Sequence, residues 1–305
     1  MIIAVILLWL LTGSKAQTLD VIQANFLWNY HGTNFQPNTL GNGWEISPEI
    51  RYYFAGNYRT GGSRQTMLYK NQFLMGAYFQ TTWSEEWKRD STAEYPRIVK
   101  GMPENGGVTN FNVGMSFKFI PNQTLILTLD AGVSFRSLYV KNGVRDSTPE
   151  YPYYRGIPIK FDLLYNDDDF RFFNRINLSL YTENSFFVFK SIKTEGRILD
   201  ETADSKGEHF LAANLECSLF SPGRRSAGST VADFSLINQC RWYNGTDCFG
   251  LSEKKSGDYK VGIGISLRQF QNMDEAIKLK VLFGQSGLDV GVAVKLFPLY
   301  DLLSN

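Results

Sequence analysis

In many segments of the sequence, every second residue is apolar and the charged side chains lie only at the positions between them. In residues 288–297, for example, Asp289 and Lys295 lie on one parity together with Gly291 and Ala293, and only Leu and Val occupy the other. Because side chains alternate along a strand, such a segment has one charged and one apolar face. A face lined with charges can attract ions of opposite sign, so these residues are the first candidates for chemistry. They are Glu45, Glu49, Arg51, Lys70, Lys118, Asp130, Arg136, Lys160, Asp162, Arg171, Arg175, Glu216, Asp233, Arg241, Lys260, Arg268, Lys278, Lys280, Asp289 and Lys295.

Basic residues outnumber acidic ones in this set. In a narrow passage, such a surplus raises the local concentration of anions. The first hypothesis is therefore a passage for small solutes with a preference for anions. The alternative is that acids and bases pair into ladders and fill the interior.

A repeated segment supplies the second group of candidates. Residues 89–96 (RDSTAEYP) recur almost unchanged as residues 145–152 (RDSTPEYP), and similar flanks indicate a duplicated hairpin. We expect these residues in two neighbouring outer loops, as a ligand site or as a charge-paired lid. The charge-paired lid is the favoured interpretation. Exposed ion pairs stabilise by only about 0–1 kcal/mol each, so the presence of the motif in both copies is explained by loop shape or by recent duplication. The candidates are Arg89, Asp90, Glu94, Tyr95, Arg145, Asp146, Glu150 and Tyr151.

Catalytic, metal and redox sites have little support. His31 and His209 are the only histidines, the usual general bases, and no Rossmann, P-loop, zinc or triad motif is present. We therefore expect no enzyme, cofactor or metal. The acidic turn at residues 166–169 lacks the spaced ligands of a calcium loop, so a solvated turn is expected. Cys240 and Cys248 are close enough in sequence for a disulfide, whereas Cys217 has no evident partner.

Twelve alternating segments must position these residues. The predicted strands cover residues 21–30, 44–54, 67–83, 109–120, 125–139, 156–165, 170–181, 210–220, 230–242, 259–268, 276–284 and 288–297, with 184–192 continuing the seventh. Segments of about ten residues cross a bilayer at a tilt, and an even number brings both ends to one side. A charge facing mid-bilayer lipid would cost about 2–4 kcal/mol, and none breaks the parity. The prediction is an all-β, transmembrane, antiparallel up-and-down barrel of about twelve strands, in which the last strand pairs with the first.

The closing segment resembles the terminal insertion signal of bacterial outer-membrane β-barrel proteins. Asp289, Gly291, Val294 and Leu296 match its spacing of polar, glycine and apolar positions, although the chain continues past Phe297 to Asn305. The resemblance implies a porin-like barrel in the cell outer membrane. The alternatives are a non-conducting structural, adhesive or secretion-associated barrel and, with less support, a lipid-modifying outer-membrane enzyme.

The beginning of the chain and its charge complete the expectations. An apolar run over residues 2–11 followed by Ser14-Lys15-Ala16 is typical of a cleavable signal peptide, so residues 1–16 are expected to be removed and 17–305 to form one barrel domain. A formal net charge of +1 argues against nucleic acid as a partner. Outer-membrane lipid and small solutes are the expected partners. The oligomeric state is left open.

Overall fold

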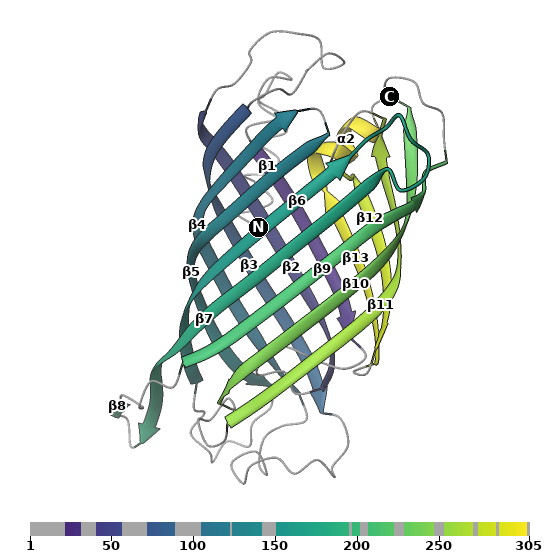
Figure 1. Cartoon of the computed structure of the whole chain (residues 1–305). Coiled ribbons are helices and arrows are strands. Elements are labelled where there is room, and N and C mark those ends of the chain that lie inside the picture. Colours follow the sequence, from purple (N-terminus) through teal and green to yellow (C-terminus); the bar gives the residue numbers. More distant parts are fainter. Residues whose placement is uncertain are drawn as a thin grey trace.

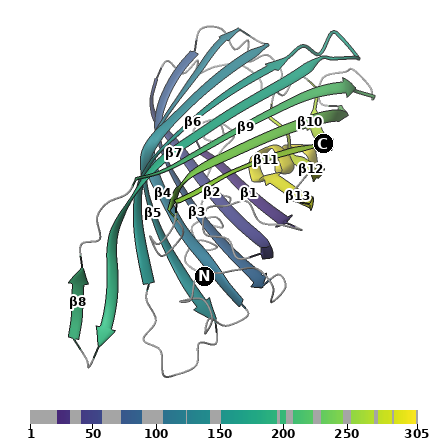
Figure 2. The same ribbon diagram turned by 60° about the horizontal axis from the view of Figure 1, so that its bottom comes forward.

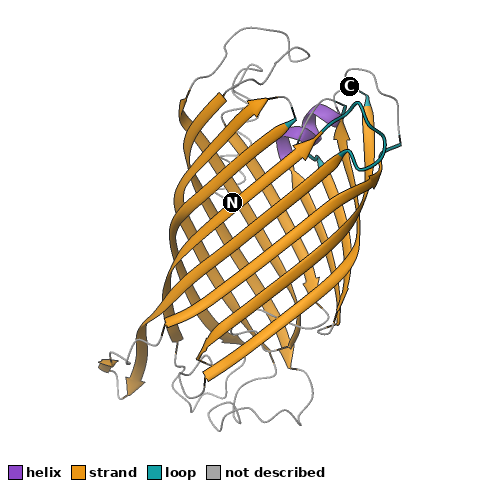
Figure 3. Ribbon diagram, viewed as in Figure 1, coloured by secondary structure: helices purple, strands orange, loops and turns teal. Residues whose placement is uncertain are grey.

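The computed structural model describes most of the predicted strands. It covers residues 22–31, 41–56, 72–88, 105–122, 124–141, 151–194, 197–201, 207–222, 229–246, 253–270, 274–284 and 287–303. Nearly all of these residues are in strands, and a short helix follows the last strand (Figure 3). Among the described residues, no helix is long and apolar enough to cross a membrane.

The elements follow one another along the chain as an almost unbroken series of long strands. They are β1 (Ile22–His31), β2 (Gly41–Gly56), β3 (Gln72–Lys88), β4 (Asn105–Asn122), β5 (Leu125–Lys141), β6 (Tyr151–Asn166), β7 (Arg175–Thr194), β8 (Arg197–Glu201), β9 (Gly207–Phe220), β10 (Thr230–Thr246), β11 (Glu253–Gln269), β12 (Ile277–Gly284), β13 (Gly287–Lys295) and α2 (Leu296–Leu303).

The sheet closes on itself, as Figure 1 shows. Every strand except β8 pairs antiparallel with a neighbour on each side, and β13 pairs with β1 through registers such as Trp28 with Val292. The short strand β8 pairs only with the far part of β7, and Figure 2 shows this hairpin projecting from the barrel. The predicted fold class and the pairing of first with last strand are confirmed. Closure leaves no exposed sheet edge around the wall.

Several strands are longer than predicted; β6, for example, begins at Tyr151 and not at residue 156, and β11 at Glu253 and not at residue 259. Two other predicted boundaries lie outside the observed strands, and both errors have local causes. Residues 170–174 belong to the turn between β6 and β7, so the seventh strand begins at Arg175. The last strand ends at Lys295 rather than Phe297, and α2 follows. Pro298 explains the change, because proline has no N–H for a strand ladder but is tolerated in the first turn of a helix. The predicted continuation over residues 184–192 is confirmed as part of β7.

The wall has an apolar outside and a polar inside. Large apolar side chains such as Ile263 (58% exposed) and Leu279 (49%) face outward, and rings on neighbouring strands contact one another, as in the tilted pair Phe79 and Phe111 with centroids 6.5 Å apart. The inward face instead carries buried charged and hydroxyl side chains. A soluble barrel has the opposite arrangement, so the observed one is that of a barrel surrounded by hydrocarbon.

The two ends of the barrel differ. We call the α2 end the one at which β13 passes into α2 and at which the turns after β4, β6, β9 and β11 lie (Figure 1). The helix α2 contacts β1, β11 and β13 there. We call the other end the distal end, and the β7–β8 hairpin extends from it (Figure 2).

Candidate functional site in the barrel lumen

The inward face is the candidate functional site because it gathers most of the predicted charged residues. Along each strand these positions alternate with exposed apolar ones, which assigns them to the lumen. Inward-facing charged residues from the predicted set are Glu45, Glu49, Arg51, Lys118, Asp130, Lys160, Asp162, Arg175, Glu216, Asp233, Arg241, Lys260, Arg268, Lys278, Lys280, Asp289 and Lys295.

A first group of ion pairs lies between β2, β5 and β6. The guanidinium of Arg51 donates through Nη2 to Asp130 at 2.8 Å, and its Nε lies 2.8 Å from a carboxylate oxygen of Glu49. Arg51 is on β2 and Asp130 is on β5, with β3 and β4 between them in the sheet. The pair therefore spans part of the lumen instead of running along the wall. Lys160 and Asp162 form a further pair at 2.9 Å on β6.

A second group lies between strands on the opposite side of the wall. Lys260 on β11 pairs with Asp289 on β13 at 2.6 Å, passing over β12, and both side chains are almost completely buried. Arg268, whose side chain has no exposed surface, binds Asp233 at 2.7 Å through Nε and Asp168 at 2.5 Å through Nη2. Since Asp168 belongs to the turn after β6, Arg268 ties that turn to β11.

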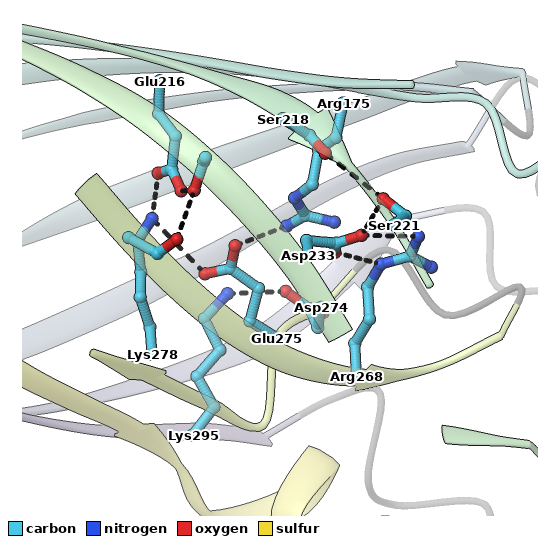
Figure 4. A network of polar contacts seen from close by, with 12 residues as sticks. Arg175, Glu216, Ser218, Ser221, Asp233, Arg268, Asp274, Glu275, Lys278 and Lys295 are labelled. Carbon is cyan, nitrogen blue, oxygen red and sulfur yellow. Dashed lines mark hydrogen bonds and ion pairs between the residues drawn. The ribbon is translucent and has the colours of Figure 1, made fainter. Parts of the chain in front are cut away.

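A third group crosses the lumen near the α2 end (Figure 4). Glu275, in the turn before β12, pairs with Arg175 of β7 at 3.3 Å and with Lys278 at 3.6 Å. Lys278 also pairs with Glu216 of β9. Asp274, the neighbour of Glu275, pairs with Lys295 of β13 at 2.8 Å. The contacts of Glu275 with Arg175 and of Lys278 with Glu216 join parts of the barrel that are not neighbours in the sheet, so side chains bridge part of the lumen at this end.

The acids of the turn before β12 are held ionised. Burial opposes the charge on Glu275, but Lys278, Arg175 and Lys295 outweigh it and lower its pKa to about 2. Burial likewise opposes ionisation of Asp274, and Lys295 and Lys118 lower the pKa of this carboxyl well below its ordinary value. Ion pairing at the α2 end therefore persists throughout the neutral and mildly acidic range.

This linkage predicts how stability depends on pH. A carboxyl with a lowered pKa in the folded state contributes stability above its unfolded pKa near 4.5, and that contribution is lost as pH falls toward about 2. In detergent micelles, the free energy of unfolding of the wild type should fall more steeply below pH 4.5 than that of Glu275→Gln. The free energies of unfolding of the two proteins should converge at the lowest pH. Parallel pH profiles would contradict the assigned pairing of Glu275.

Some predicted site residues lie elsewhere. Arg171, predicted for the lumen, is exposed in the turn after β6, because the seventh strand begins later than expected. The β5 residue Arg136 is in a strand, but its side chain is not among those described. Residues outside the described ones are Lys70, Arg89, Asp90, Glu94, Tyr95, Arg145, Asp146 and Glu150; Tyr151 begins β6 with its side chain undescribed.

The cysteines and the acidic turn were also assigned roles from sequence. Cys240 is exposed on the outward side of β10, and its predicted partner Cys248 lies outside the described residues, so the disulfide stays a prediction. Within the described part of the chain, no group of three His, Cys, Asp or Glu residues could hold a metal ion. Asp168, from the turn considered for calcium, instead binds Arg268.

Sequence reasoning missed several residues that complete the lumen contacts. Asp274 and Glu275 lie in a turn, where the alternation of strands gives no direction for side chains. Glu183 lies on β7 beyond the predicted end of that strand, and it accepts a hydrogen bond at 2.6 Å from the hydroxyl of Ser134 on β5. Gly156 of β6 lies beneath this contact, where a Cβ atom would collide with both side chains.

Two solved structures of other proteins are similar to this chain in fold at low sequence identity. No protein-family model and no curated protein sequence matches the chain. The solved β-domain of the Bordetella autotransporter BrkA is similar with a TM-score of 0.49 and 12% identity, covering 90% of this chain and 97% of that one. The transport unit of the autotransporter AIDA-I from Escherichia coli is similar with a TM-score of 0.45 and 8% identity, covering 94% and 92%. Neither similarity assigns a function to this chain.

Proposed function

We propose that this protein is an outer-membrane β-barrel whose lumen is closed at rest, with a structural, adhesive or secretion-associated role. The observation that carries the proposal is the burial of the charged side chains inside. Arg268, Lys260, Asp233 and Asp289 are at most 2% exposed, although an open aqueous channel would leave its lining accessible to water. This supports the charge-paired, filled interior over the porin-like passage.

The pairs that cross the lumen strengthen this proposal. Two of these pairs, Arg51 with Asp130 and Glu216 with Lys278, join strands that are separated in the sheet, and Arg175 with Glu275 joins β7 to the turn before β12. A solute passing along the axis would have to break such pairs and leave buried charges uncompensated. Removing one partner of a buried pair typically costs about 3–5 kcal/mol. A closed resting state follows from that cost.

Conductance in planar bilayers tests the proposal. We expect no stable current steps from the wild-type barrel at neutral pH, with an open sixteen-stranded porin as positive control. The triple variant Glu49→Gln/Arg51→Ser/Asp130→Ser should conduct, because it removes a charged group that spans part of the lumen and leaves none of its three members with an unpaired charge. Retention of the folded barrel in this variant is checked by its resistance to denaturation in detergent. Stable wild-type steps with anion selectivity would overturn the closed barrel and restore the porin hypothesis.

No catalytic role is proposed. His209 lies at the distal end on the outward side of β9, where its Nδ1 and the side-chain oxygen of Asn184 form a hydrogen bond. Among the described residues, no serine hydroxyl contacts this imidazole, so the contacts described here offer no nucleophile for it to activate. We expect a phospholipase assay on the purified barrel to show no hydrolysis above the His209→Asn variant.

A further inference from the structure

The turn between β6 and β7 exposes an unusual group of aromatic side chains. Phe170, Phe172 and Phe173 are 61%, 61% and 67% exposed, more than most large apolar residues of the barrel wall. Arg171 lies between them in sequence and is also exposed. This Phe-Arg-Phe-Phe segment lies at the α2 end, at the edge of the apolar exterior. We call it the aromatic turn (residues 170–173).

The backbone of the aromatic turn and the residues next to it are fixed to the barrel by hydrogen bonds and an ion pair. Asp168 binds Arg268 inside the lumen, and the backbone N–H of Asp167 donates to the carbonyl of Asn174 at 2.7 Å. The neighbouring turn adds two contacts, because Ser221 donates from its N–H to the carbonyl of Arg171 at 2.9 Å and from its hydroxyl to Asn174 at 2.8 Å. The outward rings are therefore held by a rigid frame, which lowers the entropy lost on binding.

The backbone of Phe173 gives a second, independent indication. Its φ is 50°, in the left-handed region that a bulky side chain rarely adopts. Glycine or asparagine would suit this backbone better. A phenylalanine held in that conformation and 67% exposed contributes little to packing inside the protein. The ring of Phe173 is therefore placed to contact a molecule outside the protein.

The surface next to the aromatic turn indicates which kind of molecule the ring of Phe173 contacts. The ring of Phe172 lies 5.3 Å from the ring of Phe220, which is exposed and pairs in register with Phe234 of β10. Phe234 belongs to the outward apolar face of the wall, at 40% exposure. The aromatic turn thus continues the surface that faces hydrocarbon, at its border with water. Arg171 makes no side-chain hydrogen bond or ion pair with the described residues, so its guanidinium is available.

We propose that the aromatic turn is a phospholipid-binding site: Phe170, Phe172 and Phe173 insert at the boundary of the acyl chains, and Arg171 binds the headgroup phosphate. Guanidinium is well suited to phosphate because it can donate two parallel hydrogen bonds. The inference rests on the membrane placement proposed above but not on whether the lumen is closed. It names a lipid, and not a second protein, as the occupant of this surface.

A depth measurement tests the insertion. The full chain is used with Cys217, Cys240 and Cys248 replaced by Ser, a fluorophore on Phe170→Cys, and vesicles of phosphatidylethanolamine and phosphatidylglycerol. Spin-labelled lipids with the quencher high on the acyl chain should quench this fluorophore at least threefold more than aqueous iodide does. A fluorophore on Leu303→Cys at the end of α2 is the comparison site. Stronger quenching by iodide than by lipid at residue 170 would overturn the proposal.

A binding measurement tests the role of Arg171. Native mass spectrometry of the barrel in detergent should show bound phosphatidylglycerol, with an apparent Kd raised about tenfold by Arg171→Ala and by Phe172→Ser/Phe173→Ser. The variant Arg171→Lys should fall between, since it keeps the charge without the paired donors. Inorganic phosphate at millimolar concentration should not displace the lipid. Unchanged lipid binding in all three variants would refute the site, whereas a conducting wild-type barrel would refute only the closed lumen.

Discussion

Replacing Val292 by Arg is expected to stop assembly of the barrel. Val292 lies near the middle of β13 and pairs in register with Trp28 of β1 and Leu279 of β12. Its side chain has the parity of the apolar exterior, opposite to the buried Asp289. An arginine facing mid-bilayer lipid costs about 2–4 kcal/mol, and this strand also completes the closure of the sheet. The folded fraction after refolding into vesicles, read as resistance to denaturation in detergent, should fall at least tenfold.

The neighbouring residue provides a matched control. Ala293 has the opposite parity and pairs in register with the inward residue Lys278. The change Ala293→Ser adds one hydroxyl to a polar interior and should leave the folded fraction unchanged. If Val292→Arg folded normally and Ala293→Ser did not, the two faces of the closing strand would be assigned the wrong way round.

Removing the charge of Arg268 is expected to give the largest loss of stability. The side chain is completely buried and pairs with Asp233 and Asp168. Arg268→Met keeps much of the volume but leaves two carboxylates without a cation, so the free energy of unfolding should fall by about 3–5 kcal/mol. Urea unfolding of the barrel in phospholipid vesicles, followed by tryptophan fluorescence, measures the change.

Two further variants separate the charge effect from packing. Arg268→Met/Asp233→Leu removes the more deeply buried carboxylate as well and should recover at least half of the lost stability. Asp169→Asn, which removes an exposed charge outside the aromatic turn, should change stability by no more than about 0.5 kcal/mol. A loss below about 1 kcal/mol for Arg268→Met would show that water reaches this part of the lumen.

The strands and their faces could be predicted from the sequence because the parity of charges is a local property. The neighbours of Lys260 and Asp289 along their own strands are enough to assign both residues to the inside of the barrel. The structure places both side chains in the lumen. The same reasoning predicted that β13 pairs with β1, because a sheet in lipid cannot leave its edges unpaired.

The pairs across the lumen could not be predicted from the same pattern. Whether Arg51 meets Asp130 depends on the tilt and register of four strands, which alternation does not specify. The turns were missed for a related reason, because side chains of Asp274 and Glu275 point inward only once the turn folds over the end of the barrel. The aromatic turn was assigned to a strand because Phe170, Arg171 and Phe172 imitate the alternation of one.

The unequal lengths of the strands have a consequence for the bilayer itself. β12 has 8 residues and β13 has 9, whereas β7 has 20. At about 3.3 Å per residue and a tilt of about 40°, the wall at β12 is only about 20 Å tall, against an apolar band of about 25 Å in barrels of this kind. Lipids beside β12 and β13 must therefore compress, and those beside β7 need not. The protein would thin the membrane on one flank only, producing a local asymmetry that neighbouring molecules can sense.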